Sequence, residues 1–77
     1  MSDVPIIEVS SGINLGQFLK FANLAEDGVM ARELIQGGDV FVNGQVETRR
    51  GHKLSDDALV EVDTPEGTYG ARVRLIR

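Results

Sequence analysis

The residues of this sequence best suited to binding a ligand lie in a short basic segment in its second half. From Thr48 to Lys53 it holds three fixed positive charges and one histidine, with no acidic residue. Arginine can hold a phosphate through two parallel hydrogen bonds, whereas lysine acts as a flexible point charge. Gly51 lets the backbone come close to a ligand. The segment is therefore a candidate polyanion-binding site, and the alternative is that it forms an ordinary solvated loop.

Two further cations lie in segments that precede this cluster. Lys20 and Arg32 each fall in a stretch with helical periodicity, one in each of two predicted helices. They could join the loop cations on one surface. Equally, Arg32 could pair with a nearby acid such as Asp27 or Glu33, so its role stays open at this point.

Other kinds of chemistry find little support in the sequence. A metal site needs several ligands, and one histidine without cysteine cannot supply them. His52 has no serine and orienting acid in a catalytic pattern, and Asp56-Asp57 suits a turn better than a carboxylate pair. Gly37-Gly38 ends a helix, whereas phosphate-binding loops begin one. The sequence therefore predicts a protein that is not an enzyme and has no metal or cofactor.

The composition limits the class of protein. Seventy-seven residues suffice for one small domain, which we expect to span residues 1–77. Because cysteine is absent, we expect no disulfides and a cytoplasmic location, and no apolar run is long enough to predict a membrane span. The net charge of −4 is unusual for a nucleic-acid binder. The charge is segregated, however, with the positive charge gathered in the basic segment.

Two amphipathic helices are predicted in the first half of the chain. Asn14 is a favourable N-cap, Gln17 can complete a capping box, and the apolar residues that follow have helical spacing. Asp27 can cap a second helix, which Gly37-Gly38 ends. The short connection between them predicts that the two helices pack against each other.

Extended segments surround this helix pair. Residues 4–9, 58–62 and 71–77 are predicted strands, with a turn at Thr64-Pro65-Glu66-Gly67 between the last two. The sequence from Val40 to Glu47, with Asn43-Gly44 at its centre, carries a strong hairpin signature. The predicted fold class is α+β: a small single domain with two packed helices against a short antiparallel sheet.

The hairpin leaves one question open. A two-residue turn would put Val40 and Val42 on one face and Phe41 and Val46 on the other. Either both faces are partly covered, or the loop is longer than two residues. Asn43 most simply tolerates the positive φ of the turn; if the hairpin tip met RNA, its amide could contact a backbone group as a secondary role.

The same residues carry a resemblance to a known family. The run Leu34-Ile35-x-x-Gly38-x-Val40-x-Val42-Asn43-Gly44, preceded by Ala31-Arg32, resembles the S-four RNA-binding domain. Leu15-x-x-Phe18-Leu19-Lys20 is similar to its first helix, so the resemblance covers about residues 13–62. The segments Ile13 to Lys20 and Val46 to Arg49 are most similar to stand-alone bacterial members of the YbcJ type.

The resemblance implies an alpha-L motif that binds structured RNA, such as rRNA or tRNA, through a positive face on the helix pair and hairpin. It implies binding without catalysis, and a ribosomal or RNA-processing protein as a further partner. His52 would add a donor to the residues that match the family surface. The predicted RNA-binding residues are Lys20, Arg32, Asn43, Arg49, Arg50, His52 and Lys53.

A rival hypothesis belongs to a different functional class. Where the family commonly has a Ser-Arg pair at the start of the second helix, this chain has Asp27 and Gly28. With the negative net charge, this departure favours a protein-interaction module that keeps the fold but has lost RNA binding. This rival hypothesis predicts that the chain binds RNA weakly and that the binding does not depend on salt concentration.

Overall fold

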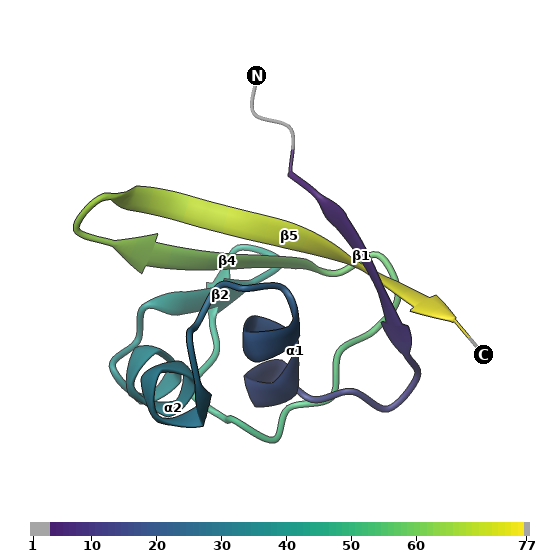
Figure 1. The fold of residues 1–77 in the computed structure, drawn as a ribbon, viewed down its shortest axis with the longest axis horizontal. Helices are drawn as coiled ribbons and strands as arrows, with labels where there is room; N and C mark the ends of the chain where they lie inside the picture. The colour runs from purple at the N-terminus through teal and green to yellow at the C-terminus, as the bar shows by residue number, and fades with distance from the viewer. Residues whose placement is uncertain (1–3, 77) are drawn as a thin grey trace.

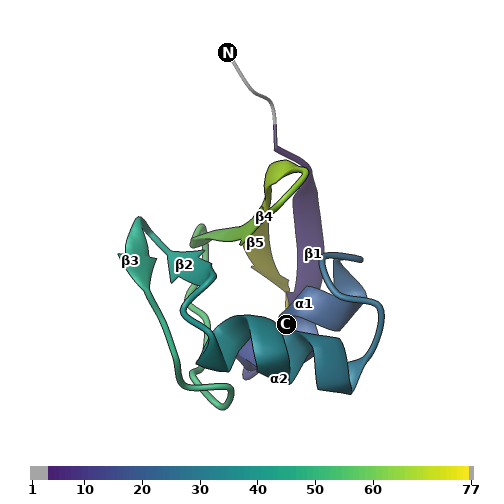
Figure 2. The same cartoon turned by 90° about the vertical axis from the view of Figure 1, so that its left-hand side faces the viewer.

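A five-stranded sheet covers a pair of helices in the computed structural model, which describes residues 4–76 (Figure 1). The strand order in the sheet is β1-β5-β4-β2-β3. Turning the molecule by 90° places β2 and β3 on one side and β1 on the other, with both helices below (Figure 2). In chain order the elements are β1 (Ile6–Ser10), α1 (Leu15–Phe21), α2 (Gly28–Gln36), β2 (Val40–Val42), β3 (Gln45–Val46), β4 (Leu59–Thr64) and β5 (Gly67–Ile76).

The predicted α+β class is confirmed, but the sheet is mixed and not wholly antiparallel. β2, β3, β4 and β5 pair antiparallel, whereas β1 pairs parallel with β5, with Ile7 opposite Val73. The parallel pair is possible because the two helices and the hairpin separate β1 from β5 in the chain. The last predicted strand is found with a longer range, and its predicted final residue, Arg77, lies outside the described residues.

The helices bury their apolar stripes against one face of the sheet. Phe18 and Ile35 are completely buried, as are Val60 and Val40 on the facing strands. Successive residues along β5 point to opposite faces of the sheet. Val73 faces this core and is buried, whereas Arg74 faces the other way and is exposed. The sheet thus has one face covered by helices and one face without them.

Both predicted helix starts are confirmed. The Asn14 side chain accepts a hydrogen bond from the backbone N–H of Gln17 at 2.9 Å, and the Gln17 side chain accepts one from the Asn14 N–H at 3.2 Å. Asp27 caps α2 by accepting from the Met30 N–H at 2.8 Å. Gly38 has a φ of 81°, as expected just beyond the end of a helix.

The hairpin has the shorter of the two possible turns. Val42 pairs directly with Gln45, and the two residues between them, Asn43 and Gly44, have φ values of 52° and 84°. These positive angles suit a tight turn between twisted strands. As the two-residue turn requires, Phe41 and Val46 share the face opposite the helices, where Val46 remains 52% exposed.

No helix in residues 4–76 has the length and apolar character that a membrane crossing requires.

Candidate nucleic-acid interface

The basic segment lies directly against the first turn of α1. The Leu15 N–H donates to the carbonyl of His52 at 2.8 Å, and the Gly16 N–H donates to the carbonyl of Arg50 at 3.0 Å. The N–H groups of a helix's first turn have no partner inside the helix, so the loop carbonyls satisfy two of them. A further bond from the Leu54 N–H to the Ile13 carbonyl, at 3.1 Å, holds the end of the segment. The fold thereby fixes the basic loop beside the helix pair.

Gly16 allows an unusually close approach between Arg50 and α1. A Cβ atom added at Gly16 would lie 2.8 Å from the Arg50 Cγ and 3.6 Å from the Arg50 carbonyl oxygen. Any side chain at this position would therefore push Arg50 away from the helix. This role of Gly16 was not predicted from the sequence, where a glycine near the start of a predicted helix was the available signal.

Arg50 contributes to the lining of two grooves, and three of the predicted RNA-binding residues line them. The first groove, of about 420 Å³, is lined by Arg50 and Lys20 together with Gly51, Gln17 and Gly28. The second, of about 390 Å³, is lined by Arg50 and Arg32 together with Gly28 and Val29. The prediction that cations from both helices could join the loop cations on one surface agrees with this arrangement.

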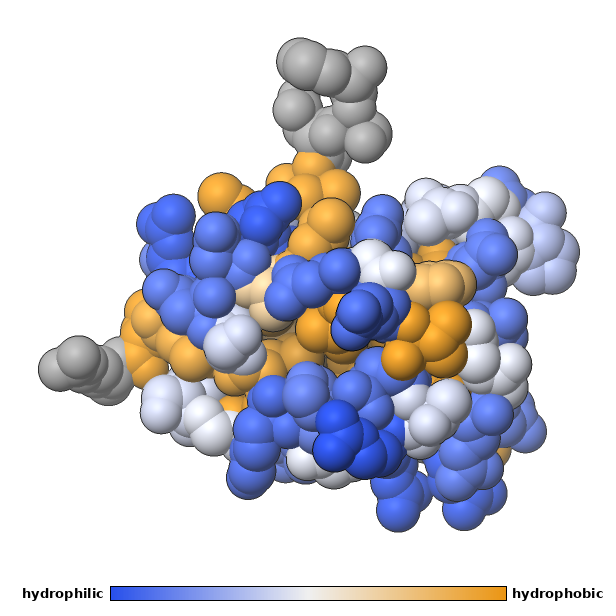
Figure 3. All heavy atoms as spheres, turned by 180° about the vertical axis from the view of Figure 1, so that it is seen from behind, coloured by the Kyte–Doolittle hydropathy of each residue, from blue (hydrophilic) through white to orange (hydrophobic). Residues whose placement is uncertain are grey.

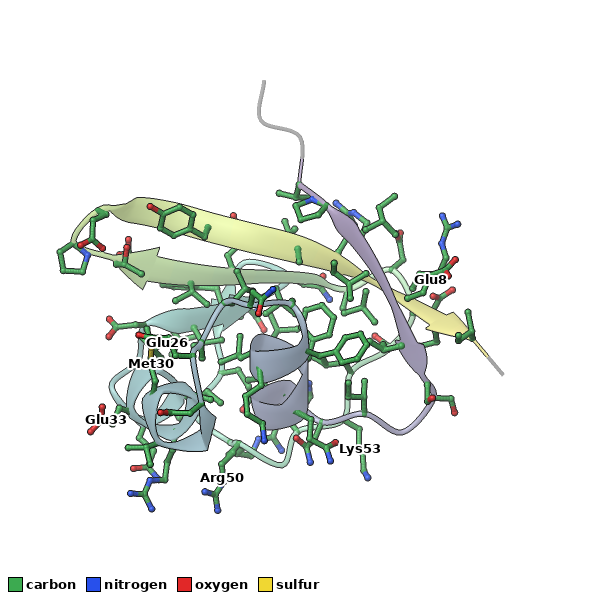
Figure 4. The ribbon with its side chains drawn as sticks, viewed as in Figure 1. Glu8, Glu26, Met30, Glu33, Arg50 and Lys53 are labelled. Atoms are coloured by element: carbon green, nitrogen blue, oxygen red, sulfur yellow. The ribbon has the colours of Figure 1, made fainter. Side chains whose placement is uncertain are left out.

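Lys53 extends this surface along the loop. It forms an isolated bridge with Asn14 just before α1, and its side chain points to the same side of the molecule as that of Arg50, away from the sheet (Figure 4). Within residues 4–76, no carboxylate lies at ion-pair distance from Lys20, Arg32, Arg50 or Lys53. We call these four residues the free cations, and each of them is exposed.

Arg49 is in a different environment, because Glu47 has already engaged it. Its Nε lies 2.9 Å from Glu47 Oε2 and its NH2 group 3.1 Å from Glu47 Oε1, which is a two-pronged ion pair. The Arg49 backbone N–H also donates to Glu47, at 3.0 Å. These hydrogen bonds from Arg49 lower the pKa of the Glu47 carboxyl from 4.5 to about 2. The acid just before the basic segment therefore cancels one of its charges, and this pairing was not predicted from the sequence.

His52 belongs to the same cluster. Its Nδ1 lies 3.3 Å from the Arg49 guanidinium and 3.6 Å from Glu47 Oε1, and the residue is half-buried. We call Glu47, Arg49 and His52 the paired cluster. Its side chains contact one another, whereas three of the free cations, Lys20, Arg32 and Arg50, line the two grooves.

Asn43 has a structural role at the hairpin tip. Its side-chain Oδ1 accepts from the Leu59 N–H at 2.9 Å, while its own N–H donates to the Leu59 carbonyl at 2.8 Å. The residue thus ties the turn to β4, and among residues 4–76 it is not part of the lining of either groove. Its predicted contact with RNA stays a prediction.

The second groove also contains an acid. Asp27 contributes to its lining beside Arg32, but no salt bridge joins the two within the described part of the chain, which leaves the predicted pairing of Arg32 with Asp27 or Glu33 unformed. No group of three or more histidine or acidic side chains in residues 4–76 could hold a metal ion. The arrangement suits anion binding by positive charge and exposed donors.

Comparison with known proteins gives two agreeing results. A family described as the S4 domain matches residues 7–69, which is most of the chain. The chain is also 39% identical, over 59 residues, to the protein named "Probable ribosome maturation protein RlbA" of Bacillus subtilis (strain 168). That alignment covers 77% of this chain and 83% of the Bacillus protein. The family resemblance noted in the sequence is confirmed.

Proposed function

This chain belongs to the S4 domain family, and from that membership we propose that it binds structured RNA without catalysing a reaction. The observation that carries the proposal is the set of four free cations, which come from both helices and the basic loop; three of them, Lys20, Arg32 and Arg50, border two adjoining grooves. Positive groups spread over a surface of this kind neutralise phosphates in succession. The fold fixes the position of Arg50, since its carbonyl accepts a backbone hydrogen bond from the Gly16 N–H of α1.

The proposed ligand is folded RNA of the ribosome or a tRNA. The Bacillus relative carries the name of a ribosome maturation protein, which supports ribosomal RNA or a ribosomal protein as the partner and the cytoplasm as the location. Recognition of double-stranded regions by shape and phosphate contact needs no base-reading side chains. The exposed cations of this surface are suited to such contacts.

The test is a titration of the full chain against a labelled, folded RNA over a salt series. Four phosphate contacts predict that log affinity falls against log salt with a slope of about −3. A K20Q/R32Q/R50Q variant should lose most of that slope, while R74E on the opposite sheet face should keep it. Binding that is absent at low salt, or that does not depend on salt, would contradict the proposal.

A second candidate function is the protein-interaction module. Its specific support is the apolar surface that the helices leave uncovered: Ile6 is 54% exposed and Val46 52% exposed. The view from behind shows a band of hydrophobic residues between hydrophilic ones (Figure 3). Association with ribosomal proteins that persists after nuclease treatment and is lost on I6D substitution would favour this candidate.

A further inference from the structure

Phe21 is the most exposed large hydrophobic residue among residues 4–76. It ends α1 with 63% of its surface exposed, whereas Phe18 and Leu19 on the same helix are completely buried. The helical spacing explains the difference, because Phe21 lies outside the stripe that packs on the sheet. A single exposed phenylalanine is common on protein surfaces. What gives this one significance is the groove beside it.

The groove next to Phe21 has a volume of about 810 Å³, nearly twice that of the groove between Arg50 and Lys20. Phe21 lines it with Ile13 and with Ile76 of β5, which is itself 45% exposed. The loop from Ser10 to Gly12 lines it as well, where Gly12 has a φ of 90°. An aromatic ring therefore borders an apolar space that also contains the polar groups of a loop.

This aromatic groove continues into the groove beside Arg50. Gln17 and Lys20 contribute to the lining of both, so the two hollows meet at these side chains. The one acid in the lining, Glu8, lies on the far side of β1 from Arg50 (Figure 4). A ligand extending from one groove into the other would thus find positive charge at one end and an aromatic face at the other.

We propose that Phe21 is a stacking platform for one unpaired nucleobase of the RNA whose phosphates contact Lys20 and Arg50. This inference rests on the proposed RNA binding and makes its ligand more specific. A nucleotide has the matching parts: an anionic phosphate and a flat aromatic base with polar edges. Bases within a duplex are stacked on one another, so only a bulged or looped base can reach the ring. Stacking on an aromatic side chain tolerates any of the four bases.

The test compares two RNA hairpins that differ by one nucleotide. One is fully paired, and the other has a single bulged adenosine in the same stem. The wild-type chain should bind the bulged hairpin about tenfold more tightly, which is the usual size of one stacking contact. F21L keeps an apolar side chain but removes the ring. It should bind both hairpins with the affinity that the wild-type chain has for the fully paired one. Y69L removes another half-exposed aromatic ring, 51% exposed on β5, and should change neither affinity.

Three outcomes would overturn the inference, and they can be told apart. Equal wild-type affinity for the two hairpins would refute base stacking while leaving phosphate binding intact. If F21L lost the same amount of affinity for both hairpins, Phe21 would act through the structure of α1 and not by stacking on the base. If neither hairpin bound at low salt, the proposed RNA binding would fail together with this inference. An upfield shift of the adenosine ring protons on binding wild type but not F21L is the expected direct signature in NMR spectra.

Discussion

Arg49 and Arg50 are adjacent in the chain and carry the same charge, but their surroundings differ. Arg49 makes a two-pronged ion pair with Glu47 and lies beside His52. Arg50 has no acidic partner among residues 4–76, and its backbone is bonded to α1 at a point where only glycine leaves room for it. The comparison shows that a count of cations overstates the charge available to a ligand. What matters is whether the local backbone brings a carboxylate to the guanidinium.

The largest effect on RNA affinity is expected from reversing the charge of Arg50. R50E would put a carboxylate between the two grooves, beside Lys20 and Arg32, and should weaken binding on the order of a hundredfold. The matched control is R74E, which makes the same change on the sheet face opposite the helices. Fluorescence anisotropy with a labelled tRNA at fixed salt measures both. Similar losses in the two variants would mean that total charge, and not the position of Arg50, governs binding.

A smaller effect is expected when the position of Arg50 is changed but its charge is kept. In G16A the added Cβ would meet the Arg50 side chain, so the arginine must move and the RNA affinity should fall several-fold. Overpacking at this contact should also lower the free energy of unfolding by about 1 kcal/mol. G28A is the control, because a Cβ there meets nothing within 4 Å, and it should raise stability by about 0.5 kcal/mol. Urea denaturation would contradict this explanation if G16A proved as stable as wild type.

The paired cluster should appear in the pH dependence of stability more than in RNA binding. The pKa of Glu47 is about 2 in the folded chain against an ordinary 4.5, so the ionised carboxyl stabilises the fold above pH 4.5. That contribution is lost as the pH falls from 4.5 towards 2. E47Q should therefore have a lower urea midpoint than wild type at pH 7, with the difference shrinking at low pH. A difference that stayed constant between pH 7 and pH 2 would show that the ion pair contributes nothing.

Most of the fold was predictable from the sequence because short-range signals in the chain agree with the fold. The caps at Asn14 and Asp27, the turn at Asn43-Gly44 and the apolar spacing of the helices each specify a short-range structure. The parallel pairing of β1 with β5 could not be read in the same way. It joins the two ends of the described chain, and no short segment encodes a contact at that separation.

The candidate site was predictable by residue type but not by geometry. Periodicity placed Lys20 and Arg32 on separate helices, and only the structure shows that both adjoin Arg50. The pairing of Arg49 with Glu47 depends on how the loop bends, since the two residues are close in the chain but separated by Thr48. Helical spacing places Phe21 outside the buried stripe, but only the structure shows the groove beside it.

The most direct test of the difference between the two arginines is the salt slope of RNA binding in two neutralised variants. R50Q removes one free cation, so its slope of log affinity against log salt should be smaller than that of wild type by about one. E47Q/R49Q removes a pair with no net charge, so its slope and affinity should match those of wild type. If the double variant lost as much slope as R50Q, Arg49 would be exchanging Glu47 for phosphate, and the division between paired and free cations would be wrong.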